Sequence, residues 1–181
     1  MAAVKPLLTY DDLAQLPDDG KRYELLEGEL IVSPAPTPRH QRAVGLIVRF
    51  LGRAEDAGHG QVYVAPLYVV FDEDNVAEPD VLFIRTERLY IVGEADIRGA
   101  PDLVVEVLSA STRRRDLRPK LQIYARYRVP YYWIVDPDAE TVQVYELGDE
   151  GYRAPITLRA GQQLGCPLFP GITIDVGRLF A

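Results

Sequence analysis

One acidic residue interrupts the most apolar segment of the sequence. Glu106 lies within residues 103–108, which are otherwise leucine and valine. An ionised carboxylate in such surroundings costs several kcal/mol unless a partner compensates it. Two interpretations stay open from the sequence alone. Glu106 either makes a structural contact, by pairing with a buried arginine or by lying on an exposed strand face, or it is a metal ligand.

A second carboxylate and a lysine could join Glu106. Asp80 follows Pro79 at the start of an apolar segment that we expect beside the Glu106 strand, where facing carboxylates can approach within about 5 Å. Mg²⁺ commonly takes one or two protein carboxylates beside water and phosphate oxygens. Lys120, on a helix after the Glu106 strand, could orient water or stabilise charge there. The alternatives are structural, because Pro-Asp often begins a strand and helical lysines often form weak surface ion pairs.

Length and composition limit the class of protein. The 181 residues, 48% hydrophobic and 26% charged, predict a single globular domain over residues 1–181. Cys166 is the only cysteine, and His40 and His59 are the only histidines, so neither an internal disulfide nor a Cys/His zinc site is expected. The longest apolar segment falls short of the ~20 residues of a membrane span. These features predict a cytoplasmic protein without a membrane association.

The distribution of charge is uneven. The net charge of −7 argues against a protein that coats nucleic acid through bulk positive charge. Residues 113–128 nevertheless carry a net charge of +6, against −13 for the remainder. Arg113, Arg114 and Arg115 are therefore either possible phosphate ligands or a solvated charge cluster.

The N-terminal third predicts a helix, a ribbon and a second helix. Residues 7–16 are expected to form a short helix with Thr9 as its N-cap. Residues 22–26 and 29–32 flank Glu27-Gly28, a pair that suits a tight hairpin loop. A second helix should begin at Pro38 and end near residue 57. Its buried stripe is predicted at Val44, Ile47, Val48 and Leu51, with His40 one turn earlier.

The remaining segments predict a mixed sheet. Residues 62–71 and 79–84 are expected to pair as a hairpin, and residues 101–109 to form a strand that is covered on both faces. A helix over residues 120–127 should follow, then a hairpin of residues 131–135 and 141–147 and a covering tail at 161–171. This order favours an α/β (α+β mixed) fold in which helices flank a mixed central sheet.

Several motifs in one order resemble a known family. Asp80, Glu106 and Lys120 resemble the PD-(D/E)xK nuclease superfamily, with the lysine moved from strand to helix. More closely, residues 9–147 resemble the bacterial family of putative restriction endonucleases, a former domain of unknown function. The motifs that carry this resemblance are residues 22–30, Ser33-Pro34 with His40-Gln41, Glu78-Pro79-Asp80, and residues 102–109, 111–116, 120–124 and 132–137.

The resemblance implies a restriction-endonuclease-like core with an N-terminal β-ribbon, and with residues 148–181 as covering strands and tail. It implies Asp80 and Glu106 as ligands of Mg²⁺ or Mn²⁺, Lys120 as the catalytic lysine and Glu24 as an added acidic catalytic residue. His40 would line the same cavity, although a structural role at the edge of the core is an equal alternative. One departure is Leu108, which stands where the superfamily spacing places lysine.

The implied function is metal-dependent hydrolysis of DNA phosphodiester bonds. The alternative is a nucleic-acid-binding or regulatory module that retains the fold without cleavage, which the acidic composition and Leu108 favour. A homodimer is also expected, since several of the 11 tyrosines could supply contact surface and two sites could address two DNA strands.

Overall fold

A six-stranded mixed sheet organises the larger part of the protein. The structure is a computed structural model that describes residues 7–17, 19–109 and 117–181. The sheet has the strand order β11-β10-β9-β8-β6-β3, in which β8 and β9 are parallel and all other neighbours are antiparallel. Its strands are β3 (Gly60–Val64), β6 (Val81–Arg85), β8 (Leu103–Val107), β9 (Tyr131–Asp136), β10 (Thr141–Glu146) and β11 (Ile156–Leu158).

A second, smaller sheet contains the predicted N-terminal ribbon. Its order is β2-β1-β5-β4-β7, and its strands are β1 (Arg22–Leu26), β2 (Glu29–Ser33), β4 (Val69–Val70), β5 (Val76–Ala77) and β7 (Ile97–Arg98). Between β1 and β2, Glu27 and Gly28 both adopt positive φ angles, of 55° and 73°. Two consecutive positive φ angles match the twist of a two-residue hairpin, which confirms the loop expected there.

The long helix α2 (Pro38–Asp56) covers one face of the six-stranded sheet. The Thr37 hydroxyl accepts a hydrogen bond from the backbone N–H of His40 at 3.3 Å, and Pro38 occupies the first turn, where its missing N–H is harmless. Ile47 and Leu51 are buried as predicted, whereas Val44 and Val48 are only half-buried. The other residues that α2 buries among its apolar contacts are Ala43, Phe50 and Ala54.

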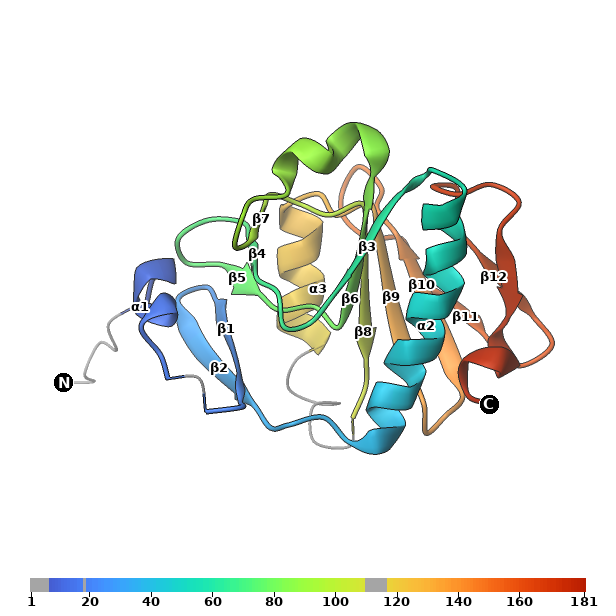
Figure 1. Ribbon diagram of the computed structural model, residues 1–181, viewed down its shortest axis with the longest axis horizontal. Coiled ribbons are helices and arrows are strands. Elements are labelled where there is room, and N and C mark those ends of the chain that lie inside the picture. The colour runs from blue at the N-terminus through green and yellow to red at the C-terminus, as the bar shows by residue number, and fades with distance from the viewer. Residues whose placement is uncertain (1–6, 18, 110–116) are drawn as a thin grey trace.

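The opposite face of the sheet is covered by α3 (Leu117–Arg126), so the two helices lie on either side (Figure 1). From α3, Ile123 and Tyr124 pack with Val104 of β8 and Tyr132 of β9. The other helical elements are α1 (Tyr10–Ala14), η1 (Thr86–Ile91) and η2 (Val176–Leu179). This arrangement confirms the predicted α/β fold class. Among the described residues, no helix has the length and apolar character that crossing a membrane requires.

Two predictions about individual segments need correction. Residues 62–71 do not form one strand, because the chain leaves the six-stranded sheet at Pro66, which has no N–H to donate, and continues into β4 of the other sheet. β3 does pair with β6 as an antiparallel neighbour, but β4 and β5 intervene where a simple turn was expected. The tail is also more regular than predicted. It contains the hairpin β12 (Gln163–Gly165) and β13 (Thr173–Asp175), and Phe169 is buried against the α2 face.

Candidate active site

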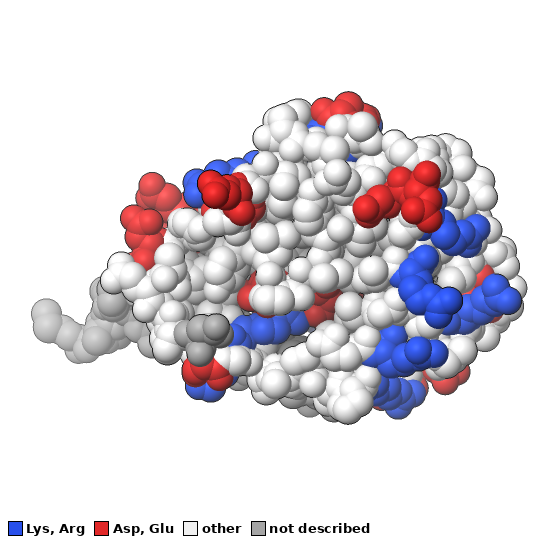
Figure 2. Space-filling model, viewed as in Figure 1, with Lys and Arg blue, Asp and Glu red and all other residues white. Residues whose placement is uncertain are grey.

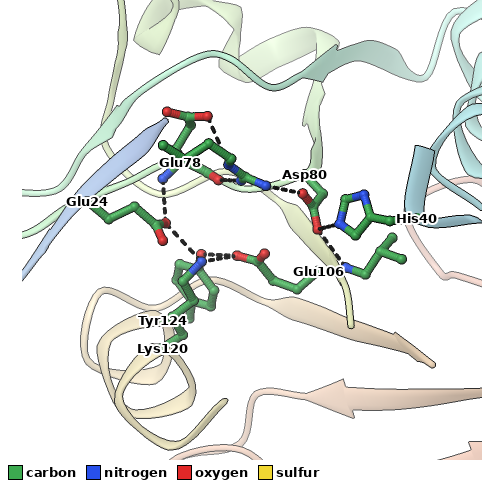
Figure 3. A network of polar contacts seen from close by, with 9 residues as sticks. Glu24, His40, Glu78, Asp80, Glu106, Lys120 and Tyr124 are labelled. Atoms are coloured by element: carbon green, nitrogen blue, oxygen red, sulfur yellow. Dashed lines mark hydrogen bonds and ion pairs between the residues drawn. The ribbon is translucent and has the colours of Figure 1, made fainter. Parts of the chain in front are cut away.

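The structure brings together four of the residues that the sequence suggested. Asp80 immediately precedes β6, and Glu106 lies on β8. Because Val81 pairs with Val105, the next position outward places Asp80 opposite Glu106. Lys120 comes from α3 and Glu24 from β1, so two sheets and a helix supply one cluster of side chains (Figure 3).

The carboxylate of Asp80 is held by three donors. Its Oδ1 accepts from Nη1 of Arg22 at 2.5 Å. Its Oδ2 accepts from the backbone N–H of Val107 at 2.7 Å and lies 3.2 Å from Nε2 of His40. Burial alone would raise the pKa of Asp80, but the His40 hydrogen bond and the Arg22 charge outweigh burial and lower it to about 2. Asp80 is therefore ionised at neutral pH.

Lys120 lies between two carboxylates. Its Nζ is 2.8 Å from Oε1 of Glu24 and 3.0 Å from Oε1 of Glu106. Tyr124, one helical turn after Lys120, donates its hydroxyl to the same Glu106 oxygen at 2.8 Å. The other oxygen of Glu106 points away from both donors (Figure 3). These contacts satisfy the buried Lys120 ammonium and leave one side of the Glu106 carboxylate directed elsewhere.

Glu106 and Lys120 respond to burial in opposite ways. Burial raises the pKa of Glu106 to about 7, with Asp80 and Glu24 adding to the rise and Lys120 opposing it. Burial would lower the pKa of Lys120, but the charges of Glu106 and Glu24 outweigh burial and raise it. Lys120 is therefore a permanent cation at neutral pH, whereas Glu106 changes its protonation state near neutrality.

The raised pKa of Glu106 predicts a pH dependence of stability in metal-free buffer. Between its usual value of 4.5 and about 7, Glu106 binds more protons in the folded state than in the unfolded state. The free energy of unfolding should therefore fall as pH rises through this window, on the order of 3 kcal/mol from this one group. Urea unfolding at pH 5 and pH 8, with EDTA, measures it. The Glu106→Gln variant should lack this component, and an equal pH dependence in both proteins would contradict the prediction.

The cluster borders a small cavity. The cavity has a volume of about 60 Å³ and is lined by Asp80, Glu106, Lys120 and Tyr132 together with residues 33–37 before α2. His40 also lines it and is 6% exposed, and its role stays a prediction. The hydroxyl of Tyr132 is buried without a hydrogen-bond partner among the described residues. A group that enters the cavity would meet both carboxylates and the Lys120 ammonium.

Three residues of the cluster did not appear among the candidates from the sequence. Arg22 contacts Asp80, and its Nε lies 3.0 Å from Oε1 of Glu78. A strand places residues i and i+2 on one face, so Arg22 could have been found from Glu24. Glu78 lies two residues before Asp80, in the irregular segment between β5 and β6. Tyr124 could have been found from Lys120, because residues i and i+4 are neighbours on a helix. The spacing of these residues can be seen in the sequence. The residue that each one contacts elsewhere in the fold cannot.

Two further predictions concern phosphate binding and metal binding. Arg113, Arg114 and Arg115 lie outside the described residues. Within the described part of the chain, no group of three or more His, Cys, Asp or Glu side chains is arranged to hold a metal ion. A divalent cation would therefore have at most the two opposed carboxylates of Asp80 and Glu106, which is within the habits of Mg²⁺.

The fold is thus a mixed sheet between two helices, with an acidic pair and a buried lysine at one end. The Uma2 family model, described as "Putative restriction endonuclease", matches residues 10–177, and the chain belongs to this family. The motifs that carry the resemblance lie within residues 9–147, and the family match continues past them to residue 177. A crystal structure described as a putative nuclease belonging to DUF820 from Anabaena variabilis ATCC 29413 has the same fold. Its TM-score is 0.81 at 20% identity, with 96% of this chain and 97% of that chain covered. No protein with curated function matches the sequence.

Proposed function

We propose that this protein is a metal-dependent endonuclease that hydrolyses phosphodiester bonds of DNA. One observation carries the proposal: Asp80, Glu106, Lys120 and Glu24 meet in one buried cluster beside a cavity, although they come from distant parts of the sequence. Two adjacent carboxylates with a nearby cation can hold a divalent ion and face a phosphate. The family and the similar fold support a nuclease, and the metal and the catalytic roles are part of the proposal.

The charge of the cluster supports a divalent cation. Four buried carboxylates, those of Glu24, Glu78, Asp80 and Glu106, meet two full positive charges, those of Arg22 and Lys120. With all four ionised, two negative charges remain in excess, which is the charge of one Mg²⁺ or Mn²⁺. The raised pKa of Glu106 follows partly from this excess. A bound ion would be held by Asp80 and Glu106 and would supply Lewis-acid chemistry at the phosphate.

The residues of the chain have separate roles in the proposed reaction. Asp80 is kept ionised and fixed in orientation by Arg22, His40 and the Val107 N–H, so His40 is a positioning residue. Lys120 would orient the attacking water and offset the charge that builds on phosphorus. Glu24 fixes Lys120 and in turn accepts the backbone N–H of Glu78 at 2.8 Å. Arg113, Arg114 and Arg115 are proposed to bind flanking phosphates by bidentate hydrogen bonds.

Nicking of supercoiled plasmid tests the proposal. Purified protein should convert supercoiled to open-circular DNA with Mg²⁺ or Mn²⁺, and EDTA should abolish the conversion, because the proposed ion is required for the reaction. Asp80→Ala and Glu106→Ala should each lose the metal-dependent component. Cleavage that persists in EDTA, or in both variants, would trace the activity to a contaminant or to another site.

One observation favours the alternative of a nucleic-acid-binding module without cleavage. Both carboxylate oxygens of Asp80 already have hydrogen-bond or ion-pair partners. A metal ion would therefore have to share Oδ1 with Arg22 or displace the Arg22 side chain from it. Leu108 in place of the usual lysine points the same way. One experiment distinguishes the two functions, which is to measure DNA binding and DNA cleavage with each metal ion. The binding module would bind DNA with every metal ion and cleave it with none. The homodimer expected from the sequence stays a prediction, and sedimentation of the purified chain measures it.

A further inference from the structure

A groove lined by arginines lies away from the candidate active site. It runs between α2 and the C-terminal segment, has a volume of about 810 Å³, and includes Arg42, Arg49, Arg53 and Arg178 in its lining. All four side chains are exposed. Figure 2 shows Lys and Arg side chains gathered over α2 and the adjoining C-terminal strands. In a chain of net charge −7, this is a local reversal of sign that the proposed reaction does not use.

These arginines are largely free of acidic partners. Among the described residues, no Asp or Glu side chain forms an ion pair with any of the four. Arg42 and Arg53 each donate one hydrogen bond to a main-chain oxygen, of Ala181 at 3.2 Å and of Thr173 at 3.0 Å. The groove's one acidic residue, Asp175, accepts the backbone N–H of Gly177 at 2.8 Å. Most guanidinium donors therefore face the groove or solvent.

The charge order along α2 opposes helix stability. The helix dipole favours acidic residues in the first turn and basic residues in the last. α2 has no acidic residue in its first turn, and its two acids, Glu55 and Asp56, stand at its C-terminal end, where Arg53 is the one favourable charge. Arg49 and Arg53 are four residues apart, a spacing at which like charges destabilise a helix by a few tenths of a kcal/mol. An anionic ligand on this face would remove the repulsion and explain the pattern.

We propose that this groove binds the phosphate backbone of duplex DNA that flanks the cleavage site. Arg42 and Arg53 are eleven positions apart, so they span about 16 Å along the helix, the rise of about five nucleotides of one strand. α2 also carries His40, which faces Asp80 two residues before Arg42. A duplex held along α2 therefore passes the end of the helix that borders the candidate active site. The proposal rests on DNA as the substrate but not on cleavage.

The experiment compares two variants of equal charge. The groove variant is Arg49→Gln, Arg53→Gln and Arg178→Gln. The control is Arg98→Gln, Arg126→Gln and Arg153→Gln, which removes three exposed arginines that are each paired with a carboxylate. Binding of a fluorescent 20-bp duplex is measured by anisotropy in EDTA, between 50 and 200 mM salt. The single variants Arg49→Gln and Arg178→Gln, neither of which removes a side-chain hydrogen bond among the described residues, guard against a folding defect.

In the groove variant, the slope of log affinity against log salt should be about 2.7 less steep than in the wild type. Between 50 and 200 mM salt, the variant should therefore lose about 40-fold less affinity than the wild type. Each single variant should flatten the slope by about 0.9, and the control should keep the wild-type slope. An unchanged slope in the groove variant, or an equal loss in the control, would overturn the proposal. So would tighter binding of polyglutamate than of DNA through the same arginines, since this would assign the groove to an acidic protein. The failure of this proposal can be told apart from the failure of the proposed function. If the protein does not nick plasmid DNA but the groove variant binds duplex DNA more weakly, the proposed nuclease function is wrong and the proposed DNA-binding groove is supported.

Discussion

Replacing Glu106 with glutamine is expected to lower the rate of metal-dependent DNA cleavage by about 10³-fold while the protein stays folded. Glutamine keeps the size of the side chain and can still accept hydrogen bonds from Lys120 and Tyr124 at one oxygen. It cannot supply the negative charge that a divalent ion requires. The folded state already tolerates a neutral group at this position, because the pKa of Glu106 is raised to about 7. The change therefore removes charge from the site with little structural penalty.

Glu78→Gln is the matched control for this prediction. Glu78 is a buried carboxylate beside Arg22 in the same cluster, but it does not line the cavity. The same chemical change there should leave cleavage within about tenfold of wild type. Rates are measured as single-turnover nicking at saturating Mg²⁺, with circular dichroism to verify folding. Equal losses in both variants would mean that the cluster is sensitive as a whole and that Glu106 has no special part in the reaction.

Replacing Lys120 with methionine is expected to reduce the free energy of unfolding by about 3–5 kcal/mol at pH 8. Lys120 is 5% exposed and forms ion pairs with the carboxylates of both Glu24 and Glu106. Methionine has a similar length but leaves both carboxylates buried without a cation. Urea unfolding in EDTA measures the loss. It should shrink as pH falls, because Glu106 takes up a proton and no longer needs the cation.

A double-mutant cycle separates the charge effect from the packing effect. If the loss comes from uncompensated carboxylates, Glu106→Gln in the Lys120→Met background should restore part of the stability, with a coupling energy of about 1–3 kcal/mol. Additive losses would instead assign the effect to the packing of the Lys120 stem. A loss below about 1 kcal/mol in Lys120→Met would show that water reaches the two carboxylates and screens them.

The sequence predicted most of the elements because their signals are local. Thr37-Pro38 begins α2, Glu27-Gly28 closes the ribbon, and the apolar segment around Glu106 is a central strand, all as expected. The prediction of one strand over residues 62–71 was wrong for a physical reason. Its β-branched and aromatic residues suit any sheet, and only the position of Pro66 in space decides where the chain passes from one sheet to the other.

Some members of the site were predictable from the sequence, but their contacts were not. Asp80 and Glu106 could be paired because antiparallel neighbours face each other, and Lys120 because a helix after a strand packs back over the sheet. That Arg22 binds Asp80 depends on how the small sheet is placed against the large one, and nothing local in the sequence encodes that placement. The arginines of α2 were likewise hidden, since their groove exists only where the C-terminal hairpin lies beside the helix.

Glu24 and Glu106 belong to different sheets and share one ammonium from a helix on the far side of the larger sheet from α2. When the ribosome has synthesised only the first strands of the two sheets, Lys120 is not yet part of the chain. When α3 has formed but the β1–β2 ribbon has not packed against the larger sheet, Glu24 is absent from the cluster. Partly synthesised or misfolded copies therefore lack the complete cluster. Under the proposed function, cleavage of DNA would be confined to molecules that have finished folding.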